Sequence, residues 1–125
     1  LVAITAEPLT PGPILAMCIG SIGAVIMYFG TKFLESQALD DVVGAIPVHM
    51  FAGIFGTLVV PLSNSDTNFG TQFLGVVSVC LFSFIFSYAV FRTLKETIGL
   101  RISKSAERLG TDKAEVGVSA YSIRD

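Results

Sequence analysis

Three long runs without charge constrain this chain more than any other feature. Residues 13–31, 42–63 and 71–91 contain no Asp, Glu, Lys or Arg. A helix needs about 20 such residues to cross the hydrocarbon core of a bilayer. Only 14% of the residues are charged, whereas soluble domains average about 25%. The sequence therefore predicts an all-α integral membrane protein with three transmembrane helices in this chain.

The breaks between these runs set the expected boundaries. Three prolines before residue 14 and a polar segment at 63–70 interrupt any helix. We expect spans at about residues 13–32, 42–63 and 69–92. Residues 1–94 are then a membrane domain and residues 95–125 a polar tail. The chain opens on Leu1 without a basic leader, so we expect it to be part of a longer polypeptide.

The basic residues predict the orientation. All eight Lys and Arg residues fall in the 32–41 connector or in residues 92–125. With three spans, these two segments lie on the same side of the membrane. The positive-inside rule places that side in the cytoplasm. We therefore expect a multi-pass protein of the plasma (inner) membrane with a cytoplasmic C-terminus.

Small residues recur on the first and second spans. On the first span Gly20 and Gly23 fall in a series at spacings of three and four, and Gly53 and Gly56 do so on the second. Small residues on one face let helix backbones approach closely in lipid. We expect these four glycines to pack against other helices. The alternative is that glycine is simply common in membrane helices.

The second span holds the only histidine of the chain, His49. It lies roughly 12 Å beyond Asp41 at about 1.5 Å per residue, which is near the midplane of a core about 30 Å thick. With α-helical periodicity, His49 shares a stripe with Ala52 and Gly56 and points into protein. An ionisable group at that depth predicts a substrate or proton pathway, and the alternative is a neutral histidine that only packs.

The start of the second span carries two further expectations. Asp40 or Asp41 is placed to cap the helix, with its charge facing the positive end of the helix dipole. Pro47 would fall in the helix interior, where it cannot donate to the Val43 carbonyl, so we expect a kink or a freed acceptor two residues before His49.

Other chemistries lack their motifs. The chain has no Gly-rich phosphate loop, no CxxC pair, no HExxH and no second histidine for a metal. Basic and acidic residues alternate in the tail, which gives no support for nucleic-acid binding. We expect no enzyme activity, no cofactor and no metal.

Several segments together resemble one known family. The acidic pair Asp40-Asp41, then Val48-His49 and the run 52–58 (AGIFGTL), match its pattern. So do residues 1–5 (LVAIT) and the tail residues Gly99, Arg101, Asp112 and Tyr121. On these motifs the chain resembles the C-terminal quarter to third of ammonium transporters, the Amt/Mep/Rh family.

The resemblance implies a fold of eleven membrane helices assembled as a homotrimer with one pore per subunit. This chain would supply the end of the eighth helix, the ninth to eleventh helices and the tail. His49 would be half of a histidine pair in the pore, with its partner on the N-terminal helices of the same polypeptide. The tail residues Gly99, Arg101, Asp112 and Tyr121 would be regulatory, where the family meets PII-type proteins.

Departures from the family pattern keep an alternative function open. Val42, Gly44, Pro47 and Met50 differ from the residues usual near the histidine, and the tail differs at 103–106 and 116–118. Such drift would suit an ammonium-sensing membrane domain fused to a cytoplasmic output domain. A third possibility is a small membrane subunit whose histidine only packs.

Overall fold

The structure, a computed structural model, describes residues 1–120 and contains only helices and loops over that range. The α-helices are α1 (Pro13–Ser36), α2 (Ala52–Val59), α3 (Phe69–Thr97) and α4 (Lys104–Leu109). Four short helices complete it: η1 (Val2–Ile4), η2 (Ile46–Phe51), η3 (Val60–Leu62) and η4 (Asp112–Val116). The chain divides into two units, Leu1–Phe82 and Ser83–Asp125, and each is described by itself.

Two helices, α1 and α3, are long and apolar enough to cross a membrane. The third expected crossing corresponds to the continuous apolar helix Ile46–Leu62, which is shorter. Its 17 residues rise about 26 Å at 1.5 Å each, which is at the lower limit for a span.

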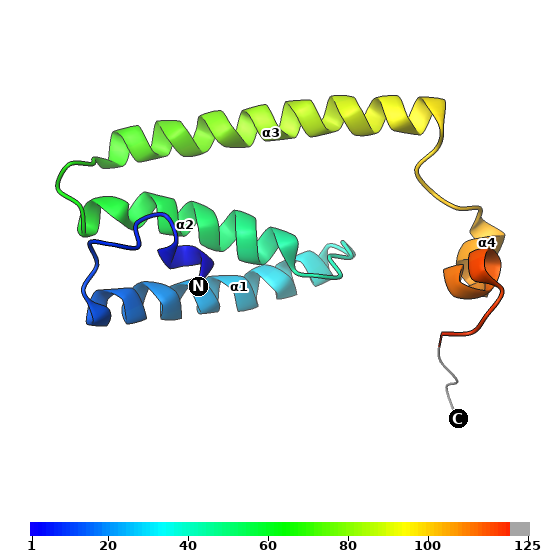
Figure 1. Ribbon diagram of the computed structural model, residues 1–125, viewed down its shortest axis with the longest axis horizontal. Helices are drawn as coiled ribbons and strands as arrows, with labels where there is room; N and C mark the ends of the chain where they lie inside the picture. The colour runs from blue at the N-terminus through cyan, green and yellow to red at the C-terminus, as the bar shows by residue number, and fades with distance from the viewer. Residues whose placement is uncertain (121–125) are drawn as a thin grey trace. The chain divides into compact units, whose positions relative to one another are not determined.

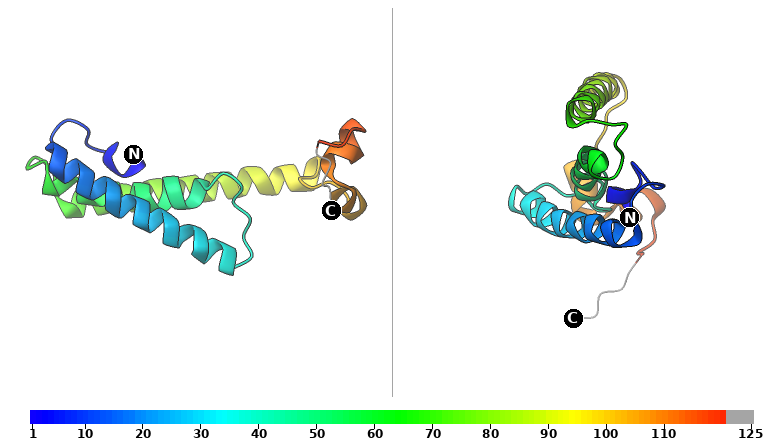
Figure 2. Two further views of the ribbon diagram at one scale, coloured as in Figure 1. Left: turned by 90° about the horizontal axis from the view of Figure 1, so that it is seen from below. Right: turned by 90° about the vertical axis from the view of Figure 1, so that its left-hand side faces the viewer.

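The core of the first unit lies where η1 packs against both α1 and α2 (Figure 1). Ala3 of η1, Ile19 of α1 and Ala52 of α2 are its buried residues. The segment 1–6, expected only as the end of a helix, therefore supplies the centre of the packing. Figure 2 shows α1 and α2 side by side from two further directions.

Glycines make this close approach possible. A Cβ added at Gly23 of α1 would lie 2.6 Å from Ala3 Cβ, and one added at Gly56 of α2 would lie 2.8 Å from Ala3 Cα. Both distances are shorter than a normal contact between carbon atoms. Gly23 and Gly56 are thus the places where η1 enters between the two helices.

The buried face of α1 differs from the expected series of small residues. It contains Ile19, Gly23, Gly30 and Leu34, whereas a Cβ at Gly20 would meet nothing within 4 Å. Gly53 of α2 makes only an ordinary contact, with 3.7 Å from an added Cβ to Val2. Of the four glycines expected to pack, Gly23 and Gly56 lie at tight contacts and Gly20 and Gly53 do not.

The second unit, as far as residue 120, carries no buried residue. It contains the end of α3, then α4 packed against η4 (orange to red in Figure 1). Ser103 caps α4 by accepting a hydrogen bond from the Ala106 N–H at 3.2 Å. The segment after α3 therefore forms local helical turns without a core of its own.

Candidate functional site

The helix that carries His49 begins later than the sequence predicts. Residues 41–44 form a turn, in which the Gly44 N–H donates to the Asp41 carbonyl at 3.0 Å. Gly44 has φ +67°, a left-handed conformation that glycine adopts without steric cost. His49 is therefore only about 6 Å along the axis from the helix start at Ala45. From the sequence we expected His49 about 12 Å beyond Asp41, because these turn residues were treated as part of the helix.

Asp41 satisfies the first N–H groups of this helix. Its Oδ1 accepts from the Ala45 N–H at 2.9 Å and its Oδ2 from the Ile46 N–H at 2.7 Å. Within residues 1–120 no side-chain hydrogen bond is present at Asp40. The carboxylate of Asp41 also faces the positive end of the helix dipole. Of the acidic pair, Asp41 makes the capping contacts.

Pro47 lies in the first turn and not in the helix interior. The helix begins at Ala45, so the missing N–H of Pro47 is one that would have no intrahelical partner anyway. Pro47 is fully buried. The expectation that Pro47 lies in the helix interior is therefore wrong, because the turn at 41–44 moves the helix start toward Pro47.

The first segment of the helix, η2, is a π-helix. The Ala52 N–H donates to the carbonyl of Pro47, five residues earlier, where an α-helix would pair residues four apart. Pro47 and Ala52 consequently share the buried face, and Gly56 and Val60 continue it. This π-turn contains one residue more than an α-helical turn. The side chains before Ala52 are therefore rotated about the helix axis from the positions they would have in an α-helix.

This rotation changes where His49 points. Pro47, Ala52, Gly56 and Val60 are buried, while Ala45 and His49 are exposed within this chain. The expectation that His49 shares a face with Ala52 and Gly56 is therefore wrong, because it assumed α-helical periodicity through residues 46–51. His49 faces away from α1 and η1. Its side chain is free to meet groups outside this unit.

Gly30 of α1 receives the buried side of the π-helix. A Cβ added at Gly30 would lie 2.6 Å from Phe51 Cδ2 and 3.1 Å from Pro47 Cβ. Both Pro47 and Phe51 belong to η2. Gly30 lies seven residues after Gly23, a spacing that places both on one helix face and was the signal in the sequence for this contact.

The loops at the other end of the α1–α2 pair are joined by polar contacts. The Asn64 side-chain amide donates to Glu7 Oε2 at 2.8 Å, and the Thr10 hydroxyl donates to Ser63 Oγ at 3.3 Å. The bond from Asn64 holds the pKa of Glu7 below its usual value. This link joins residues 57 apart, so nothing local in the sequence pointed to it.

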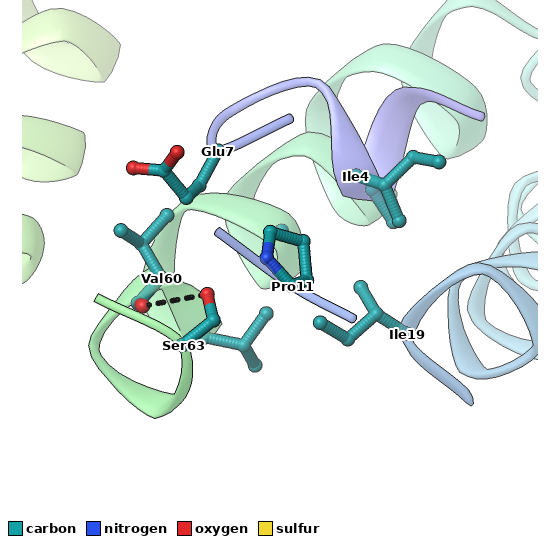
Figure 3. A pocket seen from close by; sticks show the side chains of 9 residues that line it. Ile4, Glu7, Pro11, Ile19, Val60 and Ser63 are labelled. Carbon is teal, nitrogen blue, oxygen red and sulfur yellow. Dashed lines mark hydrogen bonds between the residues drawn. The ribbon is translucent and has the colours of Figure 1, made fainter. Parts of the chain in front are cut away.

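A small pocket lies under these loops (Figure 3). Its volume is about 10 Å³, close to the minimum for one water molecule. Figure 3 shows the Ser63 hydroxyl at its edge donating to the Val60 carbonyl, at 3.2 Å. Residues from η1, α1 and α2 line it, among them Ala3, Ile19 and Gly56. The pocket is too small for an organic substrate.

The expected regulatory residues of the tail have structural contacts. Gly99, with φ +81°, donates to the Leu94 carbonyl at 3.0 Å and ends α3. Arg101 pairs with Glu107 at 2.6 Å. Asp112 accepts from the Ala120 N–H at 2.7 Å, and that bond lowers the pKa of its carboxyl. Tyr121 lies outside the described residues.

Metal ligands do not gather in the described part of the chain. Residues 1–120 contain no group of three or more His, Cys, Asp or Glu side chains that could hold a metal ion. The arrangement instead offers an exposed imidazole on a packed apolar helix. A neutral imidazole can accept at one nitrogen and donate at the other.

Comparison with known proteins gives one consistent result. A sequence model of the Ammonium Transporter Family matches residues 1–121. Ammonium transporter Amt2 of Archaeoglobus fulgidus is 34% identical over 97% of this chain, and ammonium transporter Amt1 of Methanocaldococcus jannaschii is 30% identical over 88% of it. The ammonium transporter of Corynebacterium glutamicum is 29% identical over 98% of it. The chain spans about 30% of the length of each of these relatives.

Proposed function

Because this chain belongs to the ammonium transporter family, we propose that it is the C-terminal portion of a membrane protein that conducts ammonium or ammonia. The observation that carries the proposal is the match over almost the whole chain, joined to an apolar helix that exposes a histidine. The protein acts as a transporter and not as an enzyme. The sensor alternative has no support in the names of the three relatives above.

Three crossings are proposed for this chain within an eleven-helix fold. α1 and α3 have the length and composition of spans, and the helix Ile46–Leu62 is the third. The hydrogen bonds between residues 7–10 and 63–64 support this arrangement, because they tie together two loops that three crossings place on one side. The basic connector and tail then lie on the cytoplasmic side of the plasma membrane.

His49 is proposed to line the substrate pathway. It is exposed within this unit although it lies in an apolar helix, so in the whole protein it meets other helices or a pore. Ionisable side chains within spans face the protein interior or a water-filled cavity. The remaining N-terminal helices of the polypeptide would supply the other wall of the pore. Asp41 and the glycines Gly23 and Gly56 hold the helix in place.

Assembly and regulation follow the family expectation. We propose a homotrimer in the bilayer, with a PII-type regulatory protein as a partner of the cytoplasmic tail. Gly99, Arg101 and Asp112 support a tail of defined local shape through their contacts. Tyr121 is proposed to belong to the same regulatory segment.

Uptake of labelled methylammonium tests the transport function. The full-length protein is expressed in cells that lack ammonium transporters of their own, and the vector alone is the control. We expect uptake that unlabelled ammonium competes away. Equal uptake by vector and full-length protein, with the protein present in the membrane, would refute the proposal.

A further inference from the structure

We propose that Gly30 and Phe51 are positioning residues for His49: the ring of Phe51, seated on Gly30, fixes the π-helix in the rotation that turns the imidazole away from the packed face. The inference rests on the proposed function, because positioning His49 matters to transport only if His49 lines the pathway. It assigns a role to two residues that do not themselves face the pathway.

The first observation is the contact itself. An added Cβ at Gly30 would lie 2.6 Å and 3.1 Å from two ring carbons of Phe51, and 3.1 Å from Pro47 Cβ. The backbone of α1 at this one position is therefore in direct contact with two side chains of η2. No side chain larger than hydrogen fits there without moving Phe51 or Pro47.

The second observation is the geometry of η2. Pro47 and Ala52, five residues apart, are both buried, and the Ala52 N–H donates to the Pro47 carbonyl. His49 lies between them in the sequence and is exposed. If residues 46–51 relaxed to an α-helix, the side chain at 49 would turn toward the face of Ala52 and Gly56. The direction of His49 thus depends on keeping the π-turn.

Both ends of the π-turn are held. At its start, Asp41 accepts hydrogen bonds from Ala45 and Ile46. At its end, Phe51 occupies the space that Gly30 leaves open, beside Pro47 from the first turn. A π-helix is rare, appears mostly as a single turn within an α-helix, and is frequent at functional sites. The contact with Gly30 supplies the packing that holds this one.

The chain offers a matched pair of substitutions on α1. Gly30→Ala places a Cβ against Phe51, whereas Gly20→Ala places one where nothing lies within 4 Å. Both changes replace glycine by alanine in the same helix. They differ in whether the new methyl group disturbs η2.

The experiment measures the reactivity of a cysteine introduced at position 49 in the full-length protein. His49→Cys is combined with Cys18→Ser, Cys80→Ser and serine at every cysteine outside this chain, and the rate of modification by methyl methanethiosulfonate is recorded. We expect Gly30→Ala to change this rate at least threefold and Gly20→Ala to leave it within twofold. With His49 intact, Gly30→Ala should lower methylammonium uptake at least tenfold, and adding Phe51→Leu should recover most of that loss.

Loss of packing alone would give a different result. If Gly30→Ala lowers uptake without changing the reactivity at position 49, or if Phe51→Leu recovers nothing, the positioning role is refuted. Should Gly30→Ala fail to fold, Phe51→Ala replaces it, and an unchanged rate at position 49 then refutes the proposal. If the thiol of the His49→Cys protein never reacts, the proposal is refuted as well, because the side chain then faces no accessible path.

The reactivity measurement also separates this inference from the proposed function. Wild-type uptake by the His49→Ala protein would refute the role of His49 in transport. The rate at position 49 would still show whether Gly30 and Phe51 set the direction of that side chain.

Discussion

Gly56 and Gly53 are neighbouring glycines of α2 in different surroundings. A Cβ at Gly56 would run into the backbone of Ala3, whereas one at Gly53 would make a normal contact with Val2. We expect Gly56→Ala to destabilise the full-length protein by about 1–3 kcal/mol through overpacking. Gly53→Ala should be neutral or stabilising, because alanine favours a helix over glycine by about 1 kcal/mol. Thermal unfolding in detergent, followed by circular dichroism, measures both.

Equal melting temperatures for these two variants would contradict the packing of η1 between α1 and α2. The same test applies at Gly23, where the Cβ of Ala3 is the obstacle.

Glu7 gives a prediction about pH. The hydrogen bond from Asn64 lowers the pKa of Glu7 below its ordinary value of 4.5. A carboxyl whose pKa is lower in the folded state stabilises that state above the unfolded pKa, and the effect is lost as the pH falls through the folded pKa. We therefore expect wild type to be more stable than Glu7→Gln near neutral pH. The difference in melting temperature should shrink below about pH 4.5.

If the difference in melting temperature between wild type and Glu7→Gln stayed constant as the pH falls, the stabilising role of the Glu7 carboxylate would be contradicted. Asn64→Ala serves as the matched variant, because it removes the donor and leaves the carboxyl in place.

At the scale of a helix, Asp41 and Asp40 form a test pair for the cap. Only Asp41 makes the side-chain hydrogen bonds to Ala45 and Ile46. We expect Asp41→Ala to lower the stability of the full-length protein by about 0.5–2 kcal/mol, the usual cost of removing an N-cap. Asp40→Ala should change it by less than about 0.5 kcal/mol. Denaturation of the two purified variants in the same detergent gives the comparison.

If the two aspartate variants lost stability equally, the acidic pair would act through its charge and not through the hydrogen bonds of Asp41.

The helix with His49 shows where sequence reasoning succeeds and where it stops. Hydropathy predicted an apolar helix there, and the acidic pair predicted a cap, because both signals are local. The positive φ of Gly44 and the π-helix at 46–51 were not predicted. The π-helix packs through Phe51 and Pro47 against Gly30 of α1, and Gly30 lies 21 residues before Phe51. A one-residue change of register was enough to move His49 to another face.

For the whole molecule, the family and the helical class were predictable because they rest on composition and on motifs. The packing of the helices was less predictable from the sequence. The segment 1–6 has too few residues to show a helical period, yet Ala3 is the centre of the core. The link from Glu7 to Asn64 joins two polar loops that no motif connects.

The proposed orientation predicts which loops face outward. In a background of Cys18→Ser, Cys80→Ser and serine at every cysteine outside this chain, we place single cysteines at Asp66 in the 63–68 loop and at Ser105 in the tail. A membrane-impermeant maleimide added to intact cells should label Asp66→Cys and not Ser105→Cys, because three crossings put these positions on opposite sides. Permeabilised cells, in which both should react, are the control. Labelling of both positions in intact cells would overturn the three-crossing topology.

Flux through the purified full-length protein tests whether His49 lines the pathway. The protein is reconstituted into liposomes, and an ammonium gradient drives flux in wild type, in His49→Ala and in Met50→Leu, a volume-conserving change at the neighbouring exposed side chain. We expect flux in wild type and Met50→Leu, and at least a tenfold loss in His49→Ala. Wild-type flux through His49→Ala at equal protein would contradict the claim that this histidine lines the pathway.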